Sequence, residues 1–351
     1  MSVRWALIVG LCALAAFGGK LAYQRSLLNE ERGEVVVSRL DQWVPHLYRA
    51  GKRGKVTFSQ HEGHRIVWHP PMQQAARTQP QPQSGAVTYG FSGGRLGDNL
   101  LSYLHARWIA YRDHLHFVFQ PFPMADEFAL AQENSVVAEK EVVEIPYFPE
   151  PSMKNRDHPF VVDWDDPGFR EEIARCLAPT KPHVLLELPK DKITVGVHVR
   201  RAGRFDAIAL HREYPLKFPP DSYYLEQIQR IARIFEGQPL YVFLLTDDLQ
   251  PQAMLERYKA ALPFANIEWG CRERAPDNDL DDFFSIPLFD CLVLCDSNFS
   301  IVASKLAHYK VRIAPTHYWR KKERVGVSGV EIVFNPSALP PTPSPTNVQT
   351  K

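Results

Sequence analysis

Two adjacent arginines directly after an apolar strand are the residues of this sequence that point most clearly to a chemical role. Residues 195–199 read as an apolar strand and run into Arg200 and Arg201. In open α/β sheets, ligands bind beyond the carboxyl ends of strands. A guanidinium group pairs bidentately with phosphate oxygens and stays charged at any working pH. We therefore interpret the pair, with His198 beside it, as a phosphate-binding site, and a salt-bridged loop is the competing interpretation.

A glycine-rich turn at 93–97 is a second candidate for anion binding. Gly94 and Gly97 let backbone amides approach a ligand, and the start of the helix that follows favours negative charge. Asp98 or Asn99 could instead cap this helix, which requires no ligand. The glycine spacing does not match the dinucleotide-binding fingerprint, so the turn by itself does not identify a site.

Two further groups of polar residues follow expected strands. Asp247 and Asp248 come directly after the segment 240–246. Because the arginine pair already supplies positive charge, hydrogen bonding to a nucleobase or ribose is favoured over a magnesium site for these carboxylates. The turn with Ser297, Asn298 and Ser300 can offer hydroxyls and helix-start amides to phosphate. As an alternative, the same turn is only a helix cap.

The elements that must position these residues alternate between strands and helices. Leu96, Leu100, Leu104 and Trp108 recur every four residues, which predicts a helix packed by one face on a sheet. The other helices are expected at 221–235, 251–261, 279–289 and 299–309. Strands are expected at 86–89, 115–119, 194–199, 240–246, 266–269, 291–295 and 311–314. This alternation predicts an α/β fold with parallel sheets, in two Rossmann-like lobes at 85–190 and 191–334.

Composition excludes several classes of protein. The 351 residues exceed what one hydrophobic core usually organises, which agrees with two lobes. The chain has 41 basic and 40 acidic residues, so it lacks the field that would attract nucleic acid, and we expect no nucleic-acid partner. The 5 cysteines are odd in number and lack zinc-ligand spacing, which indicates neither a disulfide framework nor a metal knuckle.

The two ends of the chain are expected to lie outside the globular part. Residues 5–19 are uncharged and almost wholly apolar, a run that is short for a membrane-spanning helix. We expect 1–23 to be a single-pass signal anchor in the cell envelope or secretory pathway, or a signal peptide whose cleavage would release a secreted protein. Residues 24–84 are expected to form a stem with minor sheet structure and a Pro/Gln-rich linker, and 335–351 a disordered tail.

Four segments occur together in a characteristic order: 94–101, 197–201, 245–248 and 296–303. The most specific are the His-x-Arg-Arg block at 198–201 and the Ser-x-Phe-Ser block at 297–300. Together they resemble the recurrent blocks of the superfamily of α-1,2-, α-1,6- and protein O-fucosyltransferases. The resemblance runs over 86–314, which is most of the globular part.

This resemblance implies a GT-B-like pair of Rossmann-like lobes, GDP-fucose as donor, a glycan or glycoprotein acceptor, inversion at the sugar carbon, and no cofactor or metal. Arg200 or Arg201 would hold the β-phosphate and act in catalysis. Asp247 or Asp248 would meet the guanine. The donor-binding residues that the resemblance implies are His198, Gly94, Gly97, Asn99, Asp247, Asp248, Ser297, Asn298 and Ser300.

Two departures from the family pattern concern catalysis. The family has Gly-Asp directly after the second arginine, whereas here residues 202–205 intervene before Asp206. The first block has Asp98 and Asn99 where Asn-Gln is usual. Asp206 and Asp98 are therefore the candidates for a catalytic base. The altered loop also leaves open a catalytically inactive protein of the same fold that binds a nucleotide sugar or a glycan.

Overall fold

The computed structural model describes residues 45, 48–49, 51, 54–59, 65–69, 85–132, 142–145, 147, 162–201, 203, 210–273, 279–322 and 324–338. The expected anchor at 1–23, the linker at 70–84 and Asp206 lie outside the described residues, as does the tail beyond residue 338.

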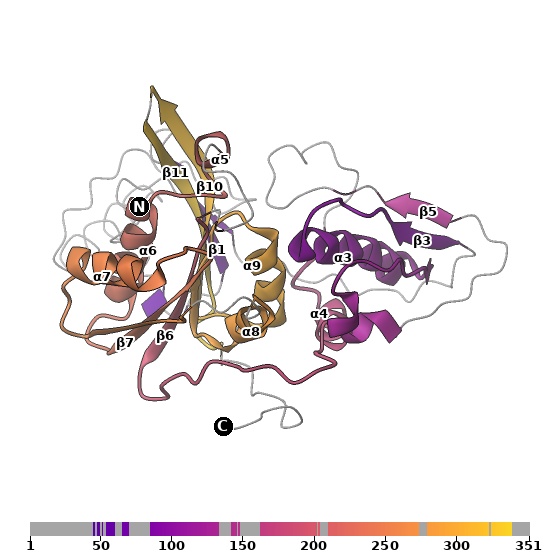
Figure 1. Ribbon diagram of the computed structural model, residues 1–351, viewed down its shortest axis with the longest axis horizontal. Helices are drawn as coiled ribbons and strands as arrows, with labels where there is room; N and C mark the ends of the chain where they lie inside the picture. Colours follow the sequence, from indigo (N-terminus) through magenta and orange to yellow (C-terminus); the bar gives the residue numbers. More distant parts are fainter. Residues whose placement is uncertain are drawn as a thin grey trace, which may run out of the picture.

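The fold is mixed α/β and contains two sheets (Figure 1). The larger sheet has the order β2-β1-β11-β10-β9-β6-β7-β8, and the smaller has the order β4-β3-β5. The larger sheet is built from β1 (Gly54–Ser59), β2 (Arg65–His69), β6 (Ile193–Val199), β7 (Leu240–Thr246), β8 (Ile267–Cys271), β9 (Cys291–Val293), β10 (Val311–Lys321) and β11 (Arg324–Phe334). The smaller sheet is built from β3 (Ala86–Tyr89), β4 (His116–Phe117) and β5 (Val142–Ile145).

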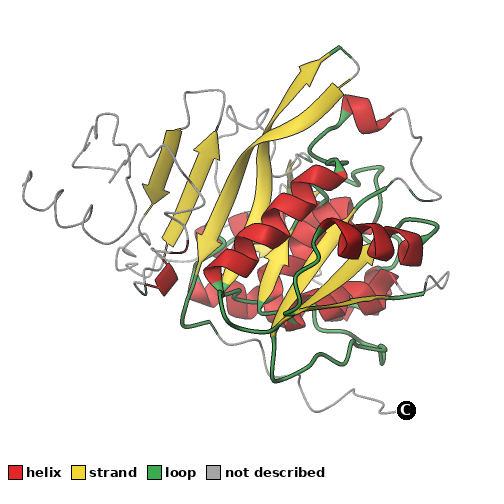
Figure 2. Cartoon of the chain, turned by 90° about the vertical axis from the view of Figure 1, so that its left-hand side faces the viewer, coloured by secondary structure: helices red, strands yellow, loops and turns green. Residues whose placement is uncertain are grey.

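Helices connect these strands and cover both faces of the larger sheet (Figure 2). The α-helices are α3 (Leu96–Asp113), α4 (Pro167–Cys176), α5 (Leu210–Glu213), α6 (Asp221–Ile234), α7 (Pro251–Ala261), α8 (Asp279–Ser285) and α9 (Asn298–Ala303). Short 3₁₀ helices are η1 (Ala125–Glu127), η2 (Ala129–Gln132), η4 (Ile286–Leu288) and η5 (Ser304–Leu306). The η segments following α8 and α9 explain why these two α-helices are shorter than predicted.

The prediction of parallel sheets is confirmed for the smaller sheet and for β10, β9, β6, β7 and β8. It is wrong for the rest of the larger sheet, where β11, β1 and β2 are added in antiparallel orientation. The strand expected at 311–314 continues through Pro315 to Lys321 and turns back as β11. Register shifts at Pro315 and His317 accommodate the proline, which lacks a backbone N–H for the ladder.

Two segments of the expected stem, β1 and β2, belong to the larger sheet. β1 pairs with β11 from Gly54 opposite Phe334 to Ser59 opposite Gly329, and β2 pairs with β1. Without β1, the backbone N–H and C=O groups of β11 on that side would be unpaired. Residues 54–59 and 65–69 therefore complete the sheet, in contrast to the separate stem expected for 24–84, while the other domain boundaries remain a prediction.

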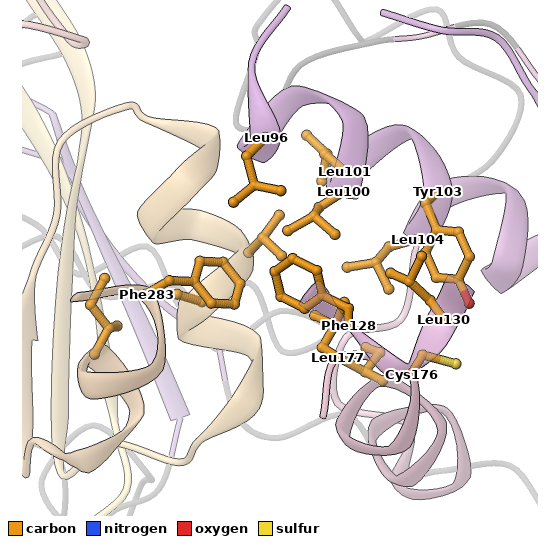
Figure 3. Packing of buried hydrophobic residues seen from close by; sticks show 14 of the residues in the cluster. Leu96, Leu100, Leu101, Tyr103, Leu104, Phe128, Leu130, Cys176, Leu177 and Phe283 are labelled. Atoms are coloured by element: carbon orange, nitrogen blue, oxygen red, sulfur yellow. The ribbon is translucent and has the colours of Figure 1, made fainter. Parts of the chain in front are cut away.

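One buried core joins the two sheets. The face of the larger sheet that packs against α3, α8 and α9 carries Phe243, Leu245, Leu292 and Leu294. The opposite face, which packs against α6 and α7, carries Val195, Val197, Val242, Leu244 and Val293. Figure 3 shows part of the first core, where Leu100 of α3 lies near Phe128 and Phe283. Side chains along a strand alternate between its two faces. Val195 and Val197 lie on the face of α6 and α7, so the even-numbered residues at the end of β6 lie on the face toward the smaller sheet.

Candidate functional site

The carboxyl ends of β9, β6 and β7 lie side by side and lead into polar residues. Val197 of β6 is paired with Val293, and Val199 is paired with Thr246. Asp296 lies three residues after Val293, as Arg200 lies three residues after Val197, and Asp247 directly follows Thr246, as Arg200 follows Val199. The three residues therefore leave three neighbouring strands, in the order β9, β6 and β7. This edge is where open α/β sheets bind ligands.

The Arg201 side chain is bound by the protein itself. Its Nη1 donates to the carbonyl oxygen of Pro219 over 2.7 Å, and its Nη2 donates to the Asp221 carboxylate and to Tyr258 Oη. The guanidinium carbon lies 5.3 Å from the centre of the Tyr224 ring. These partners belong to α6, α7 and the segment before α6. Arg201 therefore ties the end of β6 to the helices on the face away from the smaller sheet.

His198 and Arg200 lie in the buried surroundings of Cys295. His198 Nδ1 is 3.4 Å from Cys295 Sγ. Burial lowers the pKa of His198 to about 4, with Asp247 partly opposing this shift, so the imidazole is neutral at physiological pH. Burial raises the pKa of the Cys295 thiol to about 12, and the nearby Arg200 partly offsets that effect. Because His198 is uncharged and the Arg201 side chain lies on the side of α6 and α7, we take Arg200, on the side of the smaller sheet, as the candidate phosphate ligand.

The two aspartates after β7 shape the loops around them. Asp247 Oδ1 accepts a hydrogen bond of 2.5 Å from the backbone N–H of Arg201. Asp248 donates its backbone N–H to Thr246 Oγ1 over 3.1 Å, and its carboxylate accepts from the backbone of Gln250 over 2.7 Å. These hydrogen bonds of Asp248 fix the loop that leads into α7. Asp247 lies at the predicted site but also holds the turn after β6, so sequence reasoning missed the structural part of its role.

The glycine-rich turn is held by Asn99, which is buried at the start of α3. Its Oδ1 accepts from Ser92 Oγ over 2.9 Å, and its Nδ2 donates to the carbonyl oxygens of Gly94 and Arg95, each over 3.2 Å. The Asn99 amide is therefore engaged with the turn on both sides. It gives the turn its shape, and the turn remains exposed at Gly94.

Asp98 joins three segments of the chain. Its carboxylate accepts hydrogen bonds from the backbone N–H of Arg95 over 3.1 Å, from Tyr147 Oη over 3.0 Å and from Asn298 Nδ2 over 2.7 Å. Burial first, and Asp98 second, raise the pKa of Tyr147, which keeps its hydroxyl protonated as a donor. Asp98 and Asn298 therefore connect α3 with α9. In the sequence both were expected at the donor site, Asp98 as a possible base.

Gly97 allows α3 to approach α9 closely. A Cβ at this position would collide with the backbone of Asn298 and Phe299. We expect Gly97→Ala to lower the free energy of unfolding by about 1–3 kcal/mol, the usual cost of overpacking, in urea unfolding of the full chain. Gly85→Ala is the matched control, because its Cβ would meet only the Leu115 side chain, at 3.2 Å. Equal stability of the two variants would contradict this close helix contact.

The serines of the α9 turn face the protein interior. Ser297 is the N-cap residue of α9 and is buried. Ser300 is also buried, and its Oγ donates to the carbonyl oxygen of Ser297 over 3.2 Å. Ser297 makes no side-chain hydrogen bond that caps the helix, so both interpretations of this turn, phosphate binding and helix capping, stay predictions.

Asp296 is the residue of this region that sequence reasoning left without a role. Its backbone N–H donates to the carbonyl oxygen of Leu216 over 2.8 Å. In the part of the chain that the structure describes, no protein group donates a hydrogen bond to its carboxylate. Burial raises the pKa of Asp296 to about 7, against an opposing effect of Lys217. Its position directly after a buried strand was the available signal.

The described residues hold neither a cluster of metal ligands nor a membrane-spanning helix. Among them, no group of three or more His, Cys, Asp or Glu side chains is placed to hold a metal ion. No helix within the same residues is both long and apolar enough to cross a membrane. The expectation of a metal-independent reaction and the expected anchor both stay predictions.

No protein-family model and no curated protein matches the chain. Among solved structures, it is similar to POFUT1 in complex with GDP-fucose, with 14% identity, a TM-score of 0.37, and coverage of 67% of this chain and 96% of that chain. It is also similar to the fucosyltransferase NodZ from Bradyrhizobium, with 16% identity, a TM-score of 0.31, and coverage of 72% and 99%. These structural neighbours are fucosyltransferases, but at such TM-scores the similarity carries no argument about the activity of this chain.

Proposed function

We propose that this chain is a GT-B-like glycosyltransferase that transfers fucose, with inversion and without a metal ion, from GDP-fucose to a hydroxyl group of a glycan or glycoprotein. The observation that carries the proposal is the position of Arg200 among the adjoining ends of β9, β6 and β7. The four sequence blocks that resemble fucosyltransferases support the choice of donor. If residues 1–23 act as an anchor, the enzyme would work at a membrane of the cell envelope or secretory pathway.

In the proposed reaction, the protein acts mainly on the leaving group. As the bond between the sugar and the β-phosphate breaks, negative charge develops on GDP. A fixed cation directed at this charge lowers the barrier, and one such donor typically contributes about 3 kcal/mol. Arg200 is the residue that we place at the β-phosphate. Asp247, one strand further along the sheet edge, would face the nucleoside.

A binding protein of the same fold is the second candidate function. The observation that favours it is the longer spacing between the arginine pair and Asp206, where four residues, 202–205, stand in place of the single glycine of the family pattern. Such a protein would bind GDP-fucose without releasing GDP. Measurement of GDP release alongside nucleotide binding separates the two functions.

The proposal predicts selective stabilisation by GDP. At 100 times its dissociation constant, GDP should raise the free energy of unfolding of the full chain by about 2.7 kcal/mol. Thermal unfolding with GDP, UDP or CMP measures this effect. The full chain is required, because a fragment starting near Gly85 would lack β1 and β2 of the larger sheet.

Two variants complete this measurement. Arg200→Lys should reduce the shift produced by GDP, whereas the exposed hairpin variant Arg324→Lys should leave it unchanged. Equal shifts with GDP, UDP and CMP would contradict a guanine-specific site. The absence of a shift with all three would contradict the nucleotide-sugar site.

A further inference from the structure

Asp296 and the candidate phosphate ligand Arg200 follow neighbouring strands at the same edge of the larger sheet. β6 and β9 pair in parallel up to Val197 opposite Val293, and Arg200 and Asp296 each lie three residues further along the chain. Both residues act on the Cys295 thiol, Arg200 lowering its pKa and Asp296 raising it, against the larger effect of burial. The two charged groups therefore act on the same sulfur atom from the ends of adjacent strands.

The Asp296 carboxylate also acts on a residue next to the smaller sheet. It contributes to the raised pKa of Tyr147, after burial and Asp98. Tyr147 follows β5, whereas Asp296 follows β9. Asn298, two residues after Asp296, donates to Tyr147 Oη over 3.0 Å, so this turn lies at the junction between the two sheets. Lys217, in the segment before α6, is the charged group that acts on the Asp296 carboxylate. A sugar attached to a phosphate at Arg200 would extend into this junction.

The other carboxylates of the described site each accept at least one hydrogen bond from the protein. Asp98 accepts three hydrogen bonds, including those from Tyr147 and Asn298. Asp247 accepts from the Arg201 backbone, and Asp248 accepts from the Gln250 backbone. A carboxylate that accepts such hydrogen bonds has fewer lone pairs left for the proton of a substrate. Within the described residues, Asp296 is the carboxylate of this edge to which no protein group donates.

We propose that Asp296 is the base that accepts the proton of the acceptor hydroxyl group. This inference rests on the proposed fucosyl transfer. The hydroxyl oxygen forms a bond with the anomeric carbon, its proton moves to a carboxylate oxygen of Asp296, and the bond from that carbon to the β-phosphate oxygen breaks. The bonding electrons leave with GDP, and Asp296 later releases the proton to water. The pKa of about 7 suits this role, because a general base works best when its pKa is near the operating pH.

The test compares Asp296→Asn with Asp191→Asn in the full chain. Asp191 is an exposed carboxylate at the opposite end of β6, which makes it a matched control. The probe is GDP-fucose with water as the acceptor, and the measured quantity is GDP release. We expect kcat to fall at least a hundredfold in Asp296→Asn, while the thermal shift produced by GDP is retained.

The pH dependence provides a readout that a structural role would not change. In the wild type, kcat should rise with pH and level off above about 7, because the ionised carboxylate is the active form. This rise of kcat with pH should be absent in Asp296→Asn and present in Asp191→Asn.

A stability measurement tests the environment of Asp296 independently of activity. An acid whose pKa is raised on folding destabilises the protein once it is ionised. The wild type should therefore lose stability relative to Asp296→Asn as pH rises from about 4 to 7, with a constant difference above pH 7. The stability difference between the wild type and Asp191→Asn should not follow this pH dependence.

The outcomes separate the two proposals. If the wild type releases GDP and Asp296→Asn shows the same kcat and the same rise of kcat with pH, the role of Asp296 is overturned. The proposed transferase activity is then unaffected. A wild type that binds GDP-fucose but releases no GDP above the buffer blank overturns the transferase, and with it the proposed base. Loss of the GDP thermal shift in Asp296→Asn also overturns the role as base, because the residue would then act in donor binding.

Discussion

Replacement of Arg200 by lysine is expected to lower kcat for GDP-fucose by a factor of about 10² to 10³, the typical effect of removing one transition-state donor. Lysine keeps the positive charge but cannot present two parallel N–H groups to a phosphate. Because charge on the leaving group develops in the transition state, kcat should fall more than KM changes. Initial rates of GDP release over a range of GDP-fucose concentrations measure both constants.

The exposed variant Arg324→Lys is the matched control for this exchange and should keep wild-type kinetics. Thermal unfolding of each variant shows whether the protein is folded under the assay conditions. The assignment would be contradicted if folded Arg200→Lys kept the wild-type kcat while folded Arg201→Lys lost it. That result would move the phosphate contact to Arg201.

Adjacent positions explain why the sequence could not distinguish the two arginines. Successive side chains of a strand point to opposite faces, so Arg200 and Arg201 are not expected to bind one phosphate from the same side. Which face carries the ligand depends on the packing of distant elements. In the structure, Arg201 meets Asp221 and Tyr258 on the side of α6 and α7. None of these contacts is visible in the local pattern around the arginine pair.

The local elements were largely predictable because their signals lie within short segments. β7 and α7 have the predicted bounds, 240–246 and 251–261. An apolar run of seven residues indicates a buried strand, and the Pro at the start of α7 marks a helix beginning. β11 was missed because Gly326 and Gly329 weaken the strand pattern. β1 was assigned to a stem because its partner β11 is far away in the sequence. A pairing over that distance leaves no signal in the local pattern.

The candidate site was predictable in position but less so in the roles of its residues. Residues at 200–201, 247–248 and 296–300 come after the neighbouring strands β6, β7 and β9. Gly97, Asp98 and Asn298 instead connect α3 with α9, since hydrogen-bond partners from separate segments decide their roles. Residue type and order indicate where polar groups gather. They do not indicate whether a given group meets the protein or a ligand.

Arg201→Ala is expected to lower the free energy of unfolding by about 3 kcal/mol. Removal of the guanidinium takes the donor from the Asp221 carboxylate and from the Pro219 carbonyl oxygen, and it opens a space beside Tyr224. Breaking a buried ion pair typically costs about 3–5 kcal/mol. We expect the lower end, because the Asp221 side chain is 41% exposed. Urea unfolding of the full chain at neutral pH measures the change as a lower midpoint with an unchanged slope.

Asp221→Asn is the matched control for the ion pair, because asparagine keeps an oxygen acceptor for Arg201 while losing the charge. It should cost less than Arg201→Ala, since the hydrogen bond to the Pro219 carbonyl oxygen remains. At a temperature where Arg201→Ala is folded, GDP should still stabilise it, because the missing guanidinium belonged to the helix side of the sheet. Wild-type stability of Arg201→Ala combined with loss of the GDP effect would contradict this division, since it would mean that Arg201 binds the nucleotide and Arg200 holds the fold.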